Sequence, residues 1–337
     1  MKKRLLIIFL AILLLLTPFA VGCSCVKTSE TGASGEGEPI TALILGTDDA
    51  AQNTDVIMLL RYDGKSGALS VMQVPRDTYL KNEVSAPKIN HIYPALLAAG
   101  RSEKEALAET ADILSKAFSV TFDFALALRP AALARLVDEI GGVPITLPTE
   151  LVYDDPQGQT SIRLPAGEQV LSGDAAVRFV RYRAGYLEGD LGRVDAQKLF
   201  LCAFVEKAVR TLDLSHALSL LLRPPEGITL LGDKLQLVSA AKQFYQVKAI
   251  LHAVYFSVPG EAVRPENGGA WYYAINRAAT ATLLARYFDL PRKDDFDSPA
   301  RFCGPTLHFE NIYFATGYPY RVFTADEIQN IIIKKKE

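Results

Sequence analysis

The sequence has few of the residues that bind zinc or cross-link a domain. It contains four cysteines and four histidines in 337 residues, and none of them has the CxxC or Cys/His spacing that is typical of a zinc site. Cys23 and Cys25 belong to the N-terminal segment, and Cys202 lies among apolar residues of an expected helix, where a thiol is commonly buried. The sequence therefore predicts no zinc site and leaves open a disulfide between Cys202 and Cys303.

The chain also lacks an excess of positive charge. Lysine and arginine number 36 against 38 aspartates and glutamates, which gives a formal net charge of -2. A protein that grips the phosphates of nucleic acid usually carries a basic excess, so the composition argues against a nucleic-acid partner. Hydrophobic residues at 49% and charged residues at 22% are ordinary for a globular protein. Any positive charge that matters for function must be local.

No apolar run reaches the roughly 20 residues that a comfortable membrane span needs. The basic residues 2–4 precede an unbroken apolar run over 5–16, which is the shape of an export signal. Residues 20–23 resemble a bacterial lipoprotein processing box and predict lipid attachment at Cys23. An uncleaved anchor helix and plain secretion are the alternatives. All three place the chain from about residue 40 onward outside the cytoplasm.

The rest of the chain predicts one α/β domain with some antiparallel pairing, because strand and helix patterns interleave without a clear linker. We expect a signal peptide or membrane anchor over 1–22, a flexible linker over 23–38, a catalytic domain over 39–290, and an extension over 291–337 packed on that domain. Expected strands cover 40–45, 56–60, 68–74, 120–128, 143–147, 252–258 and 271–275, and expected helices cover 103–118, 130–140, 190–212 and 278–288.

A cluster of arginines is the strongest functional signal. Arg181, Arg183 and Arg193 fall within thirteen positions, beside Asp190 and Gln197. Arginine grips phosphate oxygens with two parallel hydrogen bonds, and bunched arginines repel one another unless an anion lies among them. If the segment is extended, Arg181 and Arg183 share one face, while Arg193 and Gln197 are neighbours on a helix. The cluster predicts a pyrophosphate site.

Two aspartates flank the loop between the first two expected strands. Asp48 follows one strand closely and Asp55 precedes the next, so we expect their carboxylates to meet across a tight loop. Binding groups in α/β sheets tend to lie just beyond strand ends. Two carboxylates with substrate phosphate oxygens and water are what Mg²⁺ prefers. The alternative is that both aspartates only form turns and cap strands.

A third group of polar residues follows the next expected strand. Pro75 fixes the exit of the chain from that strand, and Arg76 and Asp77 come directly after it. Lys88 supplies a further positive group in the next loop. His91 has no clear acidic or nucleophilic partner in the sequence, so we interpret it as structural.

In their order along the chain, these stretches resemble the LytR-CpsA-Psr family of bacterial cell-wall polymer ligases over about 40–288. The stretches that carry the resemblance are Leu45-Gly46-Thr47-Asp48, Thr54-Asp55, Val74-Pro75-Arg76-Asp77-Thr78, Lys88-Ile89-Asn90-His91, Ile140-Gly141-Gly142-Val143, Leu171-Ser172-Gly173, Val180-Arg181-Tyr182-Arg183, Gly189-Asp190-Leu191-Gly192-Arg193, Gln197, Pro259-Gly260-Glu261 and Tyr272-Tyr273. The resemblance implies a three-layer α/β/α domain with a central mixed β-sheet.

The resemblance also implies an activity and its residues. Members transfer a glycopolymer, such as teichoic acid or capsular polysaccharide, from a polyprenyl-pyrophosphate carrier to peptidoglycan at the outer face of the cell membrane. Asp48 and Asp55 match the acids associated with Mg²⁺. The positions that match pyrophosphate-binding or other site residues are Arg76, Lys88, Arg181, Arg183, Arg193, Asp190 and Gln197.

The expected mechanism is phosphoryl transfer without a protein nucleophile. Arginines and Mg²⁺ neutralise the pyrophosphate, Arg76 acts in catalysis, and either Asp77 or Asp190 takes the proton of the attacking sugar hydroxyl. One departure from the family pattern is Ala50, since many members have an arginine two places after the first aspartate. A hydrolase of the same carrier and a non-catalytic envelope binding protein are the alternatives.

Overall fold

The computed structural model describes residues 39–85, 87–154, 161–183, 185–186, 190–211, 213–215, 218–219, 223, 225–247, 252–264, 269–291 and 322–324. The predicted targeting segment with Cys23, the predicted linker, and most of the predicted extension with Cys303 lie outside these residues. None of the described helices is long and apolar enough to cross a bilayer.

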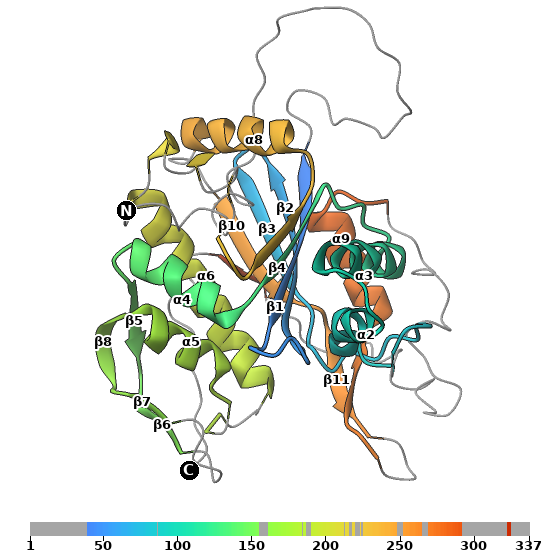
Figure 1. Ribbon diagram of the computed structural model, residues 1–337, viewed down its shortest axis with the longest axis horizontal. Coiled ribbons are helices and arrows are strands. Elements are labelled where there is room, and N and C mark those ends of the chain that lie inside the picture. The colour runs from blue at the N-terminus through green and yellow to red at the C-terminus, as the bar shows by residue number, and fades with distance from the viewer. Residues whose placement is uncertain are drawn as a thin grey trace, which may run out of the picture.

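A mixed sheet of seven strands forms the centre of the protein (Figure 1). Its strand order is β13-β10-β3-β2-β1-β4-β9. The strands are β1 (Ile40–Thr47), β2 (Thr54–Asp63), β3 (Ala68–Gln73), β4 (Phe124–Leu128), β9 (Ile228–Leu231), β10 (His252–Ser257) and β13 (Val322–Thr324). The β1–β4 and β3–β10 pairs are parallel, and the others are antiparallel. The β2–β3 pair is a hairpin.

Helices cover both faces of this sheet, which confirms the predicted α/β/α class. Successive side chains of a strand point to opposite faces, so Ile44 joins one apolar core and Leu43 and Leu45 join the other. The first core packs against α4 (Pro130–Glu139), α5 (Gly173–Arg181), α6 (Asp190–Thr211) and α8 (Lys234–Val247), and the second against α2 (Ile92–Ala98), α3 (Glu103–Phe118) and α9 (Arg277–Tyr287).

Local signals set the limits of the helices much as the sequence predicts. The Ser102 side chain caps α3 in a capping box with Glu105. Ser119, with a φ of 52°, ends this helix and delays the next strand to Phe124, later than the expected start at 120. Pro130 occupies the first turn of α4.

One edge of the sheet collects the ends of four strands. Because β1, β3, β4 and β10 all run in the same direction, their carboxyl ends meet at this edge, and β2 begins there. The remaining strands form three separate pairs: β5 (Val143–Leu147) with β8 (Gly167–Leu171), β6 (Leu151–Asp154) with β7 (Ser161–Leu164), and β11 (Gly260–Val263) with β12 (Tyr272–Ile275). The carboxyl edge is where ligands bind in open α/β sheets.

Close backbone contact sets the position of α5 near this edge. A Cβ added to Gly173 would lie 2.1 Å from the carbonyl oxygen of Ala134 in α4, so only glycine allows the two helices to come so near. The Gly173 amide also donates a hydrogen bond to Asp138 Oδ1 at 2.6 Å. The start of α5 is therefore fixed against α4, and its last turn is carried to the carboxyl edge.

Candidate functional site

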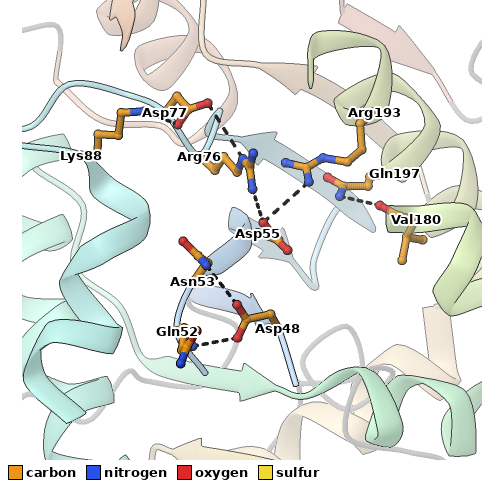
Figure 2. Close-up of polar contacts among 10 residues, drawn as sticks. All are labelled: Asp48, Gln52, Asn53, Asp55, Arg76, Asp77, Lys88, Val180, Arg193 and Gln197. Atoms are coloured by element: carbon orange, nitrogen blue, oxygen red, sulfur yellow. Dashed lines mark hydrogen bonds and ion pairs between the residues drawn. The ribbon is translucent and has the colours of Figure 1, made fainter. Parts of the chain in front are cut away.

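Asp55 lies between two arginines at the carboxyl edge. The Arg76 Nη1 atom donates to Asp55 Oδ1 at 2.6 Å, and Arg193 Nη1 lies 3.6 Å from the same oxygen. Asp55 is the second residue of β2, Arg76 follows β3, and Arg193 is in the first turn of α6. Figure 2 shows the two guanidinium groups reaching this carboxylate from different directions. The tertiary structure thus joins residues from all three predicted groups.

The ion pairs continue on the other side of Arg76. Asp77 lies 3.9 Å from Arg76 Nε and accepts a hydrogen bond from Lys88 Nζ at 2.8 Å. The sequence of charges is Lys88, Asp77, Arg76, Asp55 and Arg193, with alternating sign (Figure 2). We call these five residues the charge chain. It has three cations and two carboxylates and therefore carries one excess positive charge.

The cationic groups of the charge chain are largely buried. The exposed fraction of the side chain is 17% for Arg76, 16% for Lys88 and 4% for Arg193. Lys88 also lies over the Tyr272 ring, with Nζ 5.3 Å from its centroid. Charges in such surroundings are screened less than surface charges. An incoming anion would meet guanidinium groups that packing already holds in place.

Asp48 and Asp55 were expected to meet across the loop, but in the structure their carboxylates bond to different partners. The Asp48 carboxylate accepts hydrogen bonds from the backbone amide of Gln52 at 2.7 Å and from Asn53 Nδ2 at 3.0 Å. The Asp48 amide donates to the Asn53 carbonyl at 3.0 Å. These bonds close the loop between β1 and β2. Asp48 therefore lies at the loop, while Asp55 lies in the charge chain (Figure 2).

No three His, Cys, Asp or Glu side chains gather into a possible metal site within the described part of the chain. A divalent ion at the Asp48–Asp55 loop would therefore have at most these two predicted carboxylates as charged protein ligands. Carboxylates suit Mg²⁺, which is commonly held by one or two of them together with substrate phosphates and water. In the structure, Asp48 and Asp55 each bond to other protein groups.

Arg181 and Arg183 lie on either side of a buried tyrosine. Arg181 is the last residue of α5, and its Nη1 atom lies 3.1 Å from Asp49 Oδ2. The segment is therefore helical at Arg181 and leaves the helix at Tyr182. The Arg183 side chain is exposed and makes no ion pair with a described residue. Arg181 is close to the loop after β1, whereas Arg183 is not joined to the charge chain.

Tyr182 anchors this segment to the domain. Its ring is buried and packs edge-to-face on Tyr186 with centroids 5.0 Å apart, and its hydroxyl donates to the Val152 carbonyl at 3.3 Å. Burial raises the pKa of both phenols above its usual value, so they remain neutral. We interpret the tyrosine pair as structural support for the arginine segment.

The remaining predicted residues differ in how the structure presents them. Asp190 is the first residue of α6, but its side chain lies outside what is described. Gln197 is buried, and both ends of its amide bond to protein groups rather than facing solvent. His91 closes a short 3-10 turn, η1 (Ile89–His91).

Three residues near the site were missed in the sequence. Asp49 is the partner of Arg181, Gln73 bonds to Gln197, and Arg129 follows β4 directly. The strand-end rule that selected Asp48 and Arg76 applies equally to Arg129. No sequence signal identifies Gln73, because its partner Gln197 is 124 residues away along the chain.

An apolar cavity opens beside the charge chain. It encloses about 670 Å³, counting the part that is open to solvent. Its apolar walls come from β1, β2, β4, α4, α5 and α6, and five polar residues, Thr47, Asp55, Arg129, Arg181 and Gln197, also line it. The full lining is Ile44, Gly46, Thr47, Asp55, Val56, Met58, Leu128, Arg129, Pro130, Leu133, Val177, Val180, Arg181, Gln197, Phe200 and Leu201. A ligand with an anionic end and a hydrocarbon tail suits this arrangement.

Comparison with known proteins identifies the family to which this chain belongs. The model of the LytR_cpsA_psr family matches residues 24–287. The chain therefore belongs to the LytR-CpsA-Psr family, as its motifs predict.

Three proteins are similar to this chain in sequence or in fold. The cell wall biosynthesis protein LcpA of Corynebacterium glutamicum is 28% identical over 54% of this chain and 38% of its own length. A protein of Bacillus mycoides named polyisoprenyl-teichoic acid–peptidoglycan teichoic acid transferase TagU is 24% identical over 74% of this chain and 78% of its own. The structure titled TagT bound to LIIa-WTA superposes with a TM-score of 0.59 at 19% identity, over 77% of this chain and 94% of TagT. At this level of identity, the similarity to TagT shows a shared fold.

Proposed function

We propose that this chain is a glycopolymer–peptidoglycan phosphotransferase that uses a polyprenyl-pyrophosphate carrier as donor. The observation that carries the proposal is that a group of buried charges adjoins an apolar cavity. The buried cations of the charge chain lie beside an apolar cavity, and Asp55 belongs to both. A polyprenyl pyrophosphate has the same two parts, a doubly charged headgroup and a hydrocarbon tail.

The two parts of the site would divide the work of binding. Hydrocarbon entering the cavity gains about 0.8 kcal/mol for each buried CH₂ group. Arg76 and Arg193 would turn from Asp55 toward the phosphates, since an arginine fork matches phosphate oxygens in the same way as carboxylate oxygens. Arg181 would add a third guanidinium at the mouth of the cavity, where it lines the wall.

In the proposed reaction, a peptidoglycan hydroxyl attacks the phosphorus that bears the glycopolymer. A new P–O bond forms to the acceptor, the bridging P–O bond of the pyrophosphate breaks, and polyprenyl phosphate leaves with the bridging oxygen. The hydroxyl proton passes to a carboxylate. Asp77 suits this role because it adjoins Arg76, and Asp190 is the alternative. Buried arginines stabilise the charge on the leaving phosphate.

Asp48 and Asp55 would hold the Mg²⁺ ion in this proposal. A bound Mg²⁺ ion would neutralise phosphate charge during transfer. The protein would lie at the outer face of the cell membrane, held there by a lipid on Cys23 or by an uncleaved N-terminal helix. Its partners would be the lipid-linked glycopolymer, peptidoglycan and the membrane, with no role for nucleic acid.

The proposal predicts transfer that requires both a divalent cation and an acceptor. Full-length protein in vesicles would be incubated with labelled glycopolymer on its polyprenyl-pyrophosphate carrier, with and without purified peptidoglycan, in Mg²⁺ or in EDTA. We expect label on peptidoglycan only when acceptor and Mg²⁺ are both present. The measurement is label retained on washed peptidoglycan, together with the polyprenyl phosphate released.

Other outcomes of this experiment would contradict the proposal. Equal release of polyprenyl phosphate with and without acceptor would identify a hydrolase. Tight binding of the carrier without any release would identify a binding protein of the envelope. Full transfer in EDTA would remove the assigned roles of Asp48 and Asp55 while leaving the transferase function.

Arg181→Ala is expected to weaken donor binding more than it slows the chemical step. The side chain is 44% exposed and already pairs with Asp49, so its loss removes one cation from the cavity mouth and leaves the charge chain intact. We expect the KM for the donor to rise roughly 10-fold with a smaller change in kcat. Arg183→Ala is the matched control on the same segment. A much larger fall in kcat for Arg181→Ala would instead place Arg181 at the reacting phosphate.

A further inference from the structure

A buried chain of hydrogen bonds shares helix α6 with the charge chain. Gln73 Nε2 donates to Gln197 Oε1 at 2.5 Å, and Gln197 Nε2 donates to the Val180 carbonyl at 3.0 Å. Gln73 is 1% exposed and Gln197 is 4% exposed. We call Gln73, Gln197 and the Val180 carbonyl the amide chain. It crosses from a strand to one helix and then to the end of another.

The direction of the amide chain follows from chemistry. The Val180 carbonyl is only an acceptor, so Gln197 must turn its NH₂ group toward it. The oxygen of Gln197 then faces Gln73, so Gln73 must donate a hydrogen bond from its own NH₂ group. Val180 is in the last turn of α5, where carbonyls lack helical partners. Gln197 therefore supplies from α6 the donor that the end of α5 needs.

Every member of the amide chain is close in sequence to an arginine of the site. Gln73 ends β3 three residues before Arg76, and Val180 directly precedes Arg181. Gln197 is four residues after Arg193, and side chains four apart on a helix are neighbours. The amide chain thus connects the three separate elements that carry the three arginines.

Such a connection does something that the ion pairs cannot do. An anionic substrate competes with Asp55 for Arg76 and Arg193, so those ion pairs weaken when the substrate binds. The amide chain is neutral and buried, so an anion does not compete for its hydrogen bonds. It would hold the spacing of β3, α6 and α5 while the guanidinium groups change partner. Geometry held by supporting residues is what a precise anion site requires.

We propose that Gln73 is a positioning residue, which through Gln197 sets the spacing of the three arginines that bind the pyrophosphate. This inference rests on the proposed function, since it assigns the arginines to a pyrophosphate. Gln73 itself is buried and does not line the cavity. It is not expected to touch the substrate.

The bonding of Gln73 also indicates that stability alone does not explain this residue. Its Oε1 atom is buried and has no hydrogen-bond partner among the described residues, and a buried amide oxygen without a partner is unfavourable. Gln73→Met keeps the length of the side chain and removes that oxygen, but it leaves Gln197 Oε1 without its donor. One unsatisfied oxygen replaces another. We therefore expect a melting temperature within about 3 °C of the unmodified protein.

The test measures binding of geranylgeranyl pyrophosphate and of geranylgeranyl monophosphate to full-length protein by calorimetry. The two ligands have the same tail, so their ratio of affinities reports on the second phosphate. We expect the unmodified protein to prefer the pyrophosphate, and Gln73→Met to lower the pyrophosphate affinity roughly 10-fold with little change for the monophosphate. Thr110→Val is the matched control, since Thr110 is equally buried and bonds only within α3.

A double-mutant cycle with Gln197→Met makes the test sharper. If the two glutamines act as one unit, the doubly substituted protein should lose no more pyrophosphate preference than Gln197→Met alone. Independent, additive losses would overturn the proposal, because they would mean that Gln73 acts without Gln197.

The remaining outcomes separate the two hypotheses. If the unmodified protein shows no preference for the pyrophosphate, the proposed function fails before Gln73 is considered. If it shows the preference and Gln73→Met retains it in full, the positioning role is wrong and the proposed function stands. Equal loss of both ligands together with a lower melting temperature would show a structural role and would also overturn the inference.

Discussion

Arg193→Met is expected to lower the rate of glycopolymer transfer by about 10²–10³-fold, the usual effect of removing one group that stabilises transition-state charge. Arg193 is the most buried cation of the charge chain and shares Asp55 with Arg76. Without it, the leaving phosphate loses a guanidinium group that packing holds in place. The measurement is the single-turnover rate of label transfer to peptidoglycan at saturating donor, so that weaker binding does not enter the result.

The fold should survive this substitution. Asp55 keeps its 2.6 Å bond to Arg76, and methionine fills much of the space of the arginine stem. Arg178→Met is the matched control, since Arg178 is a partly exposed arginine of α5 that pairs with Asp174 outside the site. A transfer rate for Arg193→Met equal to that of the control would show that the charge chain is structural.

Val177→Trp is expected to close the apolar cavity and to abolish use of long-chain carriers. Val177 lines the cavity from α5 and is only partly buried, so a larger ring would extend into the empty space without displacing the core. Excluding several methylene groups of the tail should weaken binding of a long polyprenyl pyrophosphate by about 100-fold or more. Calorimetric titration with the long-chain ligand measures this loss.

The position of the cavity makes a selective effect possible. Inorganic pyrophosphate has no tail, so Val177→Trp should bind it as the unmodified protein does. Arg178→Trp places the same ring at the next position of the helix, which is exposed and does not line the cavity. Unchanged binding of the long-chain ligand by Val177→Trp would show that the tail lies elsewhere.

Much of the fold follows from signals that act over a few residues. The capping box at Ser102, the helix start at Pro130 and the hairpin turn at Asp63 each depend on contacts within one turn of chain. The strand order of the sheet does not follow from local signals. For example, β1 pairs with β4, although α2 and α3 lie between them in the sequence. The family resemblance supplied the three-layer architecture before any long-range contact was known.

The sequence predicted which residues belong to the site better than it predicted which of them form ion pairs with one another. Arg76, Lys88 and Arg193 were expected as separate cations, and the structure joins them through Asp55 and Asp77. Their separation in sequence gives no information about which carboxylate each arginine selects. Gln197 was expected to bind substrate. In the structure its amide oxygen accepts a hydrogen bond from Gln73, and its NH₂ group donates to a backbone carbonyl.

The sequence by itself determined which residue types are present and where strands end, because turn, cap and periodicity signals are local. From these it predicted arginines and aspartates at a sheet edge, and through its motifs it predicted the family. Only the tertiary structure decided that two distant arginines share Asp55, that Arg183 stays apart, and that an apolar cavity adjoins the charges. The reason is physical: ion pairs and cavities form between segments brought together by packing of the sheet and helices, and that packing depends on the whole chain.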